Sequence, residues 1–137
     1  MMKDIQIEIS TNIERLDFDL IYRFISTSYW GKGRSVQKVE TCIQNSLNFG
    51  VYLDNKQIGY ARVVTDYGHF AYIMDVFILP NYRGLGYSKQ LMRYIMDCDT
   101  LQNIGVWRLG TDDAHGLYQQ FGFEEIENPK NSMVFFK

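Results

Sequence analysis

The stretch "DVFILPNYRGLGYSKQLM", residues 75–92, joins an apolar run, a proline, a glycine-rich turn and a helical pattern. It predicts a buried strand, a turn and a helix, in that order. The first amide N–H groups of a helix lack partners, and glycines let an anion approach them closely. Arg83, Ser88 and Lys89 add side-chain donors. The turn therefore predicts a phosphate or diphosphate site, with a plain tight turn as the alternative.

Two common nucleotide loops do not match this turn. The sequence contains no GxxxxGK[ST] motif, and Lys89 stands where a GxGxxG motif requires its third glycine.

Composition narrows the class of protein. The chain has 137 residues, of which 46% are hydrophobic, so we expect one domain over residues 1–137 with a substantial core. A net charge of -2 argues against nucleic acid as a partner. The two cysteines, Cys42 and Cys98, are far apart and no metal-ligand spacing occurs, so no metal is predicted. Because no signal peptide or membrane span is visible, we expect a cytoplasmic protein without membrane contact.

Hydrophobic periodicity predicts a mixture of strands and helices, which is typical of an α+β domain with a mixed sheet. We expect strands over residues 4–9, 49–53, 58–65, 70–79, 105–110 and 131–137. We expect helices over residues 16–28, from a Ser35 cap onward, after the glycine turn, and over residues 111–123 up to Gly122.

Two segments resemble motifs of the GCN5-related N-acetyltransferase (GNAT) superfamily. "ILPNYRGLGYSKQLM" resembles motif A, Arg/Gln-x-x-Gly-x-Gly/Ala, although Ser88 replaces the final small residue. "DAHGLYQQFGF" resembles a downstream Ala-x-x-Leu-Tyr-x-x-x-Gly-Phe segment, with Thr111 where the family often has asparagine. The resemblance implies a GNAT fold. That fold would have a mixed, mostly antiparallel central sheet of about seven strands, with a splay between strands 4 and 5. Four helices would accompany the sheet.

The resemblance also implies an activity. An acetyl group would pass from acetyl-CoA to a primary amine of a small molecule or peptide by direct attack in a ternary complex. The backbone of Val76, Phe77 and Ile78 would face the thioester and the pantetheine arm, and residues 73–77 would decide whether a longer acyl group fits. The diphosphate would be bound by Arg83, Gly84, Leu85, Gly86, Tyr87, Ser88 and Lys89.

Three residues are candidates for proton transfer. Tyr118 matches the family's general acid, and its other interpretation is a packed core aromatic. Asp75 is a candidate base, but in an ideal strand it points away from the cleft, so it would need a bulge; the alternative is a structural carboxylate with a partner. His115 shares a helix face with Tyr118, and its alternative is a surface histidine.

The acceptor side is less specific. Tyr29 and Trp30 in "STSYWGKGR" would form an aromatic wall for an amine, or Trp30 merely packs the loop onto the sheet. The rival function is a non-catalytic acyl-CoA-binding sensor or assembly module, and a further rival is a nucleotide-phosphate binder. The apolar "MVFFK" leaves both an internal strand and a homodimer open.

Overall fold

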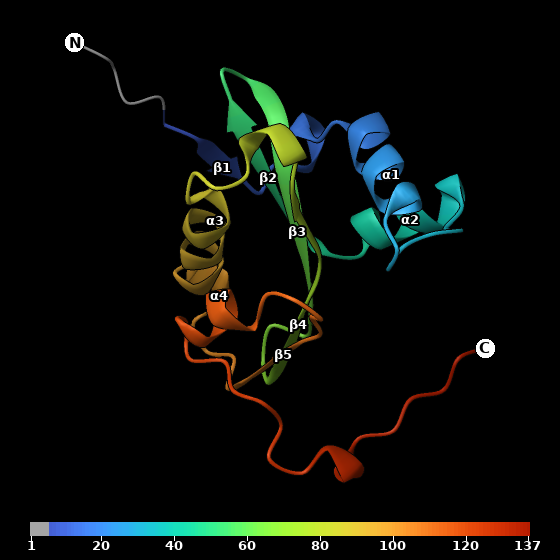
Figure 1. Cartoon of the computed structure of the whole chain (residues 1–137), viewed down its shortest axis with the longest axis vertical. Helices are drawn as coiled ribbons and strands as arrows, with labels where there is room; N and C mark the ends of the chain where they lie inside the picture. The colour runs from blue at the N-terminus through green and yellow to red at the C-terminus, as the bar shows by residue number, and fades with distance from the viewer. Residues whose placement is uncertain (1–5) are drawn as a thin grey trace.

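The structure, a computed structural model, describes residues 6–137 and contains one five-stranded sheet in this range (Figure 1). The strand order is β1-β2-β3-β4-β5, antiparallel from β1 to β4 and parallel between β4 and β5. The strands are β1 Glu8–Ser10, β2 Leu47–Leu53, β3 Lys56–Thr65, β4 Phe70–Ile78 and β5 Val106–Leu109. The helices are α1 Phe18–Thr27, α2 Val36–Gln44, α3 Tyr87–Met96 and α4 His115–Gln119.

The helices cover both faces of the sheet (Figure 1). α1 and α2 bury a small apolar cluster against one face, in which Ile21 and Ile25 lie one turn apart. α3 and α4 lie on the other face over the larger cluster, to which α3 contributes Leu91 and Ile95. Each such side chain contributes about 1.5–3 kcal/mol when it is fully buried. The amphipathic spacing therefore fixes which side of each helix meets the sheet.

Side chains cap the N-termini of α1 and α2. The Ser35 side chain accepts the Lys38 N–H at 3.1 Å and so caps α2, as predicted. Asp17 caps α1 in the same way through the Leu20 N–H. Such a cap typically contributes about 1 kcal/mol.

The first hairpin is tighter than predicted. Asp54 and Asn55, both with positive φ (49° and 64°), form its turn, so β3 begins at Lys56 rather than at Ile58. Two consecutive left-handed residues are the signature of a two-residue turn that matches the twist of the strands.

A β-bulge interrupts the pairing of β3 and β4. The register shifts between Tyr60, which pairs with Phe77, and Arg62, which pairs with Met74. Asp75 and Val76 thus oppose Ala61 alone, and Asp75 adopts the left-handed region at φ 55°. The sequence analysis concluded that Asp75 could reach the cleft only through a bulge, and the structure contains one at this residue.

The expected seven strands were wrong for the described residues, and the expected splay is not confirmed. Residues 131–137 form no strand: they contain part of a short 3₁₀ turn, Pro129–Asn131, followed by exposed, irregular backbone. β5 instead pairs in parallel with β4, and this ladder ends at Ile73 and Leu109. Part of the predicted first strand, residues 4 and 5, lies outside the described residues.

Candidate active site

A cleft of about 440 Å³ opens where the β4–β5 ladder ends. Its floor is the middle of β4. One wall comes from the loop between α1 and α2, and the other comes from the segment after β5 and from α4. The residues that line it are Tyr29, Trp30, Arg34, Tyr72, Ile73, Met74, Asp75, Val76, Leu109, Gly110, Thr111, Asp112, Asp113, Ala114 and Tyr118.

Tyr118 enters the cleft from α4. It is 7% exposed and packs edge-on against Phe123 at 6.1 Å between ring centroids. Burial raises the pKa of its phenol above 10, and the negative charge of Asp113 raises it further. Tyr118 therefore both packs in the core and lines the cleft, so its two sequence interpretations are compatible.

The short helix α4 is held by its own termini. The Thr111 hydroxyl accepts the Ala114 N–H at 3.1 Å just before the helix begins. Gly122, at φ 91°, follows the helix, and the Phe123 N–H returns to the Tyr118 carbonyl at 3.2 Å. This left-handed glycine ends the helix as predicted. The helix itself is shorter than expected, since it spans only His115–Gln119.

Asp75 is bound by two arginines. Its Oδ2 accepts the Arg62 Nε–H at 2.6 Å and an Arg34 NH1 hydrogen at 2.8 Å. Its side chain is only 3% exposed, and that of Arg62 is 7% exposed. The bulge brings Asp75 to the cleft, yet the carboxylate serves there as the centre of an ion cluster. These contacts favour the structural interpretation of Asp75.

Arg34 links this cluster to the loop between α1 and α2 that carries Trp30. Its guanidinium lies 5.9 Å from the Trp30 ring centroid while it bonds Asp75. Trp30 also contacts Phe24 of α1, with 6.4 Å between ring centroids. Trp30 therefore packs the loop, as one of its sequence interpretations predicts, and it also lines the cleft; its role as a wall for an amine stays a prediction. The sequence analysis did not name Arg34 as a site residue. An aspartate within an apolar strand did indicate that a partner must lie close to it, but not which residue that partner is.

The opposite wall of the cleft carries two acidic residues, Asp112 and Asp113, that the sequence analysis did not name as site residues. Asp112 and Asp113 are exposed and line the cleft opposite Tyr29, which is 71% exposed. Partial desolvation against the cleft wall raises the pKa of the Tyr29 phenol, and the negative charges of Asp112 and Asp113 raise it further. The sequence signal that could have identified them is a pair of adjacent aspartates three residues after the end of β5. They make the mouth of the cleft negative.

The glycine turn lies at the far end of β4. Gly84 and Gly86 have φ of 79° and 82°, and a Cβ on either would meet nothing within 4 Å. Gly86 caps α3, and the amide N–H groups of residues 85–89 have no hydrogen-bond acceptor among residues 6–137. The Arg83 Nε–H donates to the Ile78 carbonyl at 2.9 Å, so this arginine orders the loop. The turn thus presents free donors to open space.

Several predicted residues lie outside the cleft. His115 is exposed at the start of α4 and is not among the lining residues. The side chains of Phe77 and Ile78 are buried in opposite clusters, so only their backbone remains available. Within residues 6–137, no three His, Cys, Asp or Glu side chains gather as a metal site would require. None of the helices in this range is long and apolar enough to cross a bilayer.

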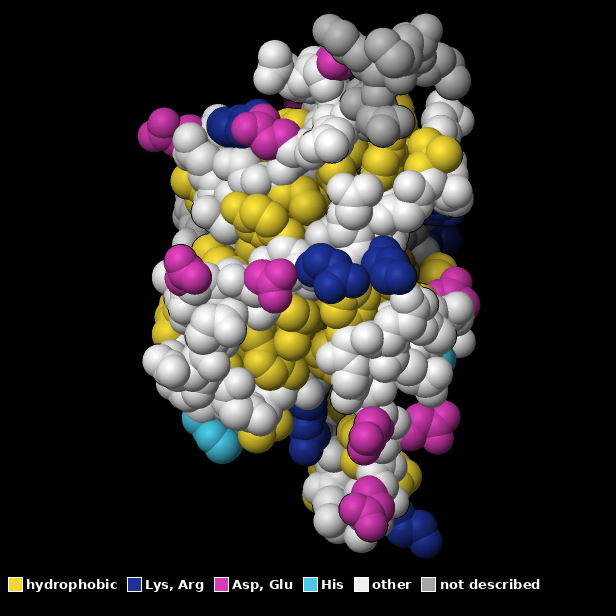
Figure 2. All heavy atoms as spheres, turned by 90° about the vertical axis from the view of Figure 1, so that its left-hand side faces the viewer, with side chains coloured by type: hydrophobic (Ala, Val, Ile, Leu, Met, Phe, Trp, Pro, Cys, Tyr) yellow, Lys and Arg dark blue, Asp and Glu magenta, His cyan; other side chains and the backbone are white. Residues whose placement is uncertain are grey.

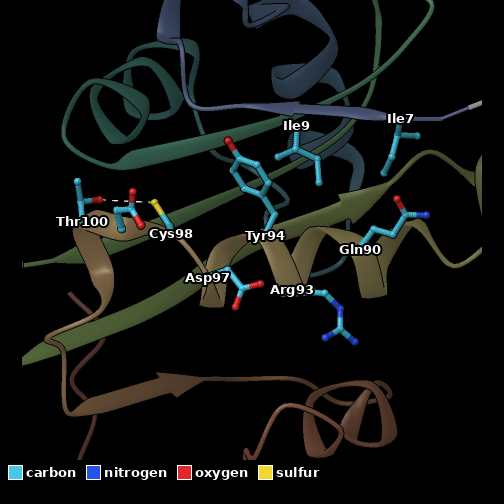
Figure 3. Close-up of a pocket in the computed structure, with 9 residues that line it drawn as sticks. Ile7, Ile9, Gln90, Arg93, Tyr94, Asp97, Cys98 and Thr100 are labelled. Atoms are coloured by element: carbon cyan, nitrogen blue, oxygen red, sulfur yellow. Dashed lines mark hydrogen bonds between the residues drawn. The ribbon is translucent and has the colours of Figure 1, made fainter.

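A larger hollow of about 680 Å³ lies elsewhere, between α3 and β1 (Figure 3). Ile7, just before β1, and Ile9 of β1 face Tyr94 and Gln90 of α3 across it (Figure 3). It contains neither the glycine turn nor Tyr118, and its polar groups do not converge on one point (Figure 3). We therefore assign the chemistry to the smaller cleft.

Comparison with known proteins agrees with this fold. The model of the acetyltransferase (GNAT) domain family matches residues 44–125, and the chain belongs to this family. A crystal structure of a GNAT-family protein from Xanthomonas campestris pv. campestris superposes with a TM-score of 0.92. The two chains are 41% identical, with coverage of 96% of this chain and 94% of that one.

Two relatives at lower sequence identity are also N-acetyltransferases by name. An uncharacterized N-acetyltransferase ycf52-like protein of Prochlorococcus marinus is 30% identical over 72% of this chain. The match spans 56% of that relative's length. An aminoglycoside N-acetyltransferase, AAC(6')-Iy in complex with CoA, has a TM-score of 0.65 at 19% identity, with coverage of 100% of this chain and 97% of that one. At that identity the likeness concerns the fold alone.

Proposed function

We propose that this protein is an acetyl-CoA-dependent N-acetyltransferase that acts on a cationic primary amine. The observation that carries the proposal is the cleft beside β4. It combines a buried, protonated tyrosine with an acidic mouth, and β4 leads directly from it to a turn of free amide donors.

The glycine turn would bind the diphosphate of CoA. Free N–H groups at a helix N-terminus and two glycines without nearby atoms suit a doubly charged group. Ser88 and Lys89 are in the first turn of α3, so they can add a hydroxyl and an ammonium group. The Arg83 Nε–H already donates to the Ile78 carbonyl, so the main role of Arg83 is to hold the turn in shape.

The acceptor would enter on the acidic side. Asp112 and Asp113 attract an ammonium group electrostatically, and Tyr29 and Trp30 offer aromatic faces to it. An amine of pKa about 10.4 must lose a proton before attack, which costs about 4–5 kcal/mol at pH 7. Asp75 is bound by two arginines and His115 lies outside the cleft, so we assign this proton to solvent water at the open mouth rather than to either residue.

The transfer is then a single displacement. The free amine nitrogen forms a bond to the thioester carbonyl carbon, and the carbon–sulfur bond breaks. The bulge at Asp75 and Val76 turns the backbone of β4 toward the cleft, where an N–H group can stabilise the charge that develops on the carbonyl oxygen. The Tyr118 hydroxyl supplies its proton to the departing thiolate, and the tyrosinate regains a proton that the attacking nitrogen loses as the amide forms. The products are an amide and CoA thiol.

The test is a turnover assay with the purified chain, acetyl-CoA and a panel of primary amines, with released CoA thiol as the readout. We expect turnover with cationic amines and an increase in Tm with acetyl-CoA, since a ligand at 100 times its Kd stabilises by about 2.7 kcal/mol. Tight binding with no turnover for any amine would favour the rival sensor or assembly module. Equal competition by ADP and CoA would favour a nucleotide-phosphate binder.

A further inference from the structure

The ion cluster beside the cleft holds more positive charge than negative. Asp75 pairs with both Arg34 and Arg62, and within residues 6–137 neither arginine pairs with a second acidic side chain. One carboxylate balances one guanidinium. These three residues, here called the arginine cluster, therefore keep one positive charge without a partner.

This excess charge has little access to water. The side chains of Asp75, Arg62 and Arg34 are 3%, 7% and 20% exposed. A charged group that is removed from water is costly unless an opposite charge compensates it. Arg62 also donates from NH1 to the Ser46 hydroxyl at 3.2 Å, but this contact adds no negative charge. The arginine cluster therefore lacks one anion.

Arg34 is the member of the arginine cluster that can bind an anion from the cleft. It lines the cleft, whereas Arg62 does not, and it is the most exposed of the three. One of its five N–H donors bonds Asp75, and the others have no acceptor among residues 6–137. A planar guanidinium with free donors suits a carboxylate, which can accept two parallel hydrogen bonds from it.

The opposite wall of the cleft carries the opposite charge. Asp112 and Asp113 line this wall and are exposed. The charge of Asp113 raises the pKa of Tyr118, the proposed proton donor, so the acidic wall adjoins the place where transfer would occur. The cleft is thus positive at Arg34 and negative near Tyr118.

This arrangement of charge is local to the cleft. The whole chain has a net charge of only -2, and acidic and basic side chains are interspersed on the face formed by α3 and α4 (Figure 2). The glycine turn, which is the proposed diphosphate site, lies at the far end of β4 and does not line the cleft. The phosphates of CoA are therefore not the anion that Arg34 lacks.

We propose that the acceptor is a free amino acid, whose carboxylate binds Arg34 while its ammonium group lies beside Asp112 and Asp113. This assignment extends the proposed acetyl transfer and rests on it. A zwitterion satisfies both walls of the cleft at once, whereas a simple amine leaves Arg34 without its anion. The cleft volume of about 440 Å³ lies within the usual range for small-molecule sites, about 300–1,000 Å³.

The first test compares each amino acid with its own carboxamide as acceptor, with released CoA thiol as the readout. The panel is glycine, leucine, phenylalanine, lysine and β-alanine, with aminomethylphosphonate added to represent a phosphate-type anion. An α-carboxamide has nearly the same size but no negative charge. Its amine has a pKa of about 7.7–8.0, as at a peptide N-terminus, so the free amine is abundant and the comparison is biased against the acid. We nevertheless expect the best acid to exceed its carboxamide at least about tenfold in kcat/KM.

Arg34→Gln tests whether this arginine makes the choice. The ratio of kcat/KM for the acid to that for the carboxamide should fall to about one. A merely structural role of Arg34 would lower both values alike and leave the ratio unchanged. Arg15→Gln is the matched control and should keep the ratio. Arg15 also has an ion pair, with Glu8, and an aromatic contact, with Tyr52 at 4.2 Å, but it does not line the cleft.

A second measurement needs no transfer. The N-acetyl derivatives of the same acids and carboxamides are titrated by calorimetry into the protein saturated with CoA. These compounds lack the ammonium group, so the carboxylate is the only charge that differs. We expect the best acid to bind at least about tenfold more tightly than its carboxamide, and Arg34→Gln to remove the difference. If Arg34→Gln does not fold, Arg34→Lys takes its place in both tests. It keeps the charge but loses the fork, so it should lower both ratios at least about threefold.

Three results would overturn the assignment. Carboxamides that are acetylated and bound as well as the acids would mean that the amine alone is recognised. A preference for the acids that survives Arg34→Gln would place the carboxylate elsewhere. Faster turnover of aminomethylphosphonate than of every amino acid would assign a phosphate-type anion to Arg34. By contrast, no turnover with any amine, together with a calorimetric preference that Arg34→Gln removes, would contradict the proposed acetyl transfer and support the carboxylate site.

Discussion

Asp75 shows what a single residue contributes to this site. Its carboxylate is almost fully buried and forms ion pairs with both Arg62 and Arg34. Through Arg34 it ties the loop that carries Trp30 to the bulge in β4. One side chain therefore fixes the position of the loop between α1 and α2 relative to the cleft floor on β4.

Replacement of Asp75 by asparagine tests this role. Asparagine tolerates the left-handed conformation at this position, so the variant removes mainly the charge. Loss of one partner in a buried ion pair typically costs about 3–5 kcal/mol, and we expect this loss in the free energy of unfolding measured with urea. The exposed pair Arg15–Glu8 supplies the control, since Glu8→Gln should change stability far less. Equal effects of the two substitutions would contradict the role of Asp75.

Tyr118 is the proposed proton donor, so the proposal makes turnover depend on it most directly. Tyr118→Phe keeps the packing against Phe123 but removes the proton donor. We expect kcat to fall by about 10²-fold while the affinity for acetyl-CoA is unchanged. Tyr94→Phe, on the face of α3 away from the cleft, is the matched control and should retain full kcat. Unchanged turnover in Tyr118→Phe would remove the assignment.

The pH dependence follows from the raised pKa of Tyr118. Burial, and then Asp113, favour the neutral phenol in the folded protein. The contribution of this group to stability is thus complete below pH about 10 and is lost as pH rises through the folded pKa. For activity, kcat should show no descending limb between pH 7 and 9. A decline with a midpoint near pH 8 in the kcat profile would indicate a different acid.

At the scale of elements, the turn between β4 and α3 combines backbone strain with open space. Gly86 precedes α3 at φ 82° with no atom near its missing Cβ. Gly86→Ala should destabilise the fold by about 1–2 kcal/mol through the left-handed backbone. The added methyl group would also stand in the proposed diphosphate site, so acetyl-CoA affinity should fall at least tenfold by calorimetry.

A matched glycine separates these effects from a general intolerance of alanine. Gly105 is likewise free of neighbours within 4 Å, but its φ lies outside the left-handed region. Gly105→Ala should leave both stability and acetyl-CoA affinity near those of the natural chain. A similar loss of affinity in the two variants would argue against the glycine turn as the binding site.

Local sequence signals predicted some elements well and failed at others for a physical reason. Ser35 as a cap, Gly122 as a stop and the strand–turn–helix at residues 75–92 depend on near neighbours, and all three are found. The ion-pair partners of Asp75 are Arg34 and Arg62, which are 41 and 13 residues away along the chain. No local sequence pattern predicts pairs at such separations. The apolar pattern of residues 131–137 predicts a strand, but these residues form none in the structure, because a strand is stable only when it pairs with a neighbouring strand.

For the molecule as a whole, β4 connects the parts. It forms the floor of the cleft, contains the bulge at Asp75 and leads into the glycine turn. Two apolar clusters, one on each face, hold it in place through Phe77 and Ile78. A rigid central strand of this kind suits a site that must align two substrates.

The most direct measurement of the central claim is a titration of the ¹⁵N-labelled protein with CoA, followed by NMR. We predict that the largest amide shifts occur at residues 84–89, whose N–H groups lack acceptors in the described structure. Smaller shifts should follow along Val76–Ile78. Shifts confined to the hollow around Tyr94 and Cys98, with residues 84–89 unchanged, would contradict the account.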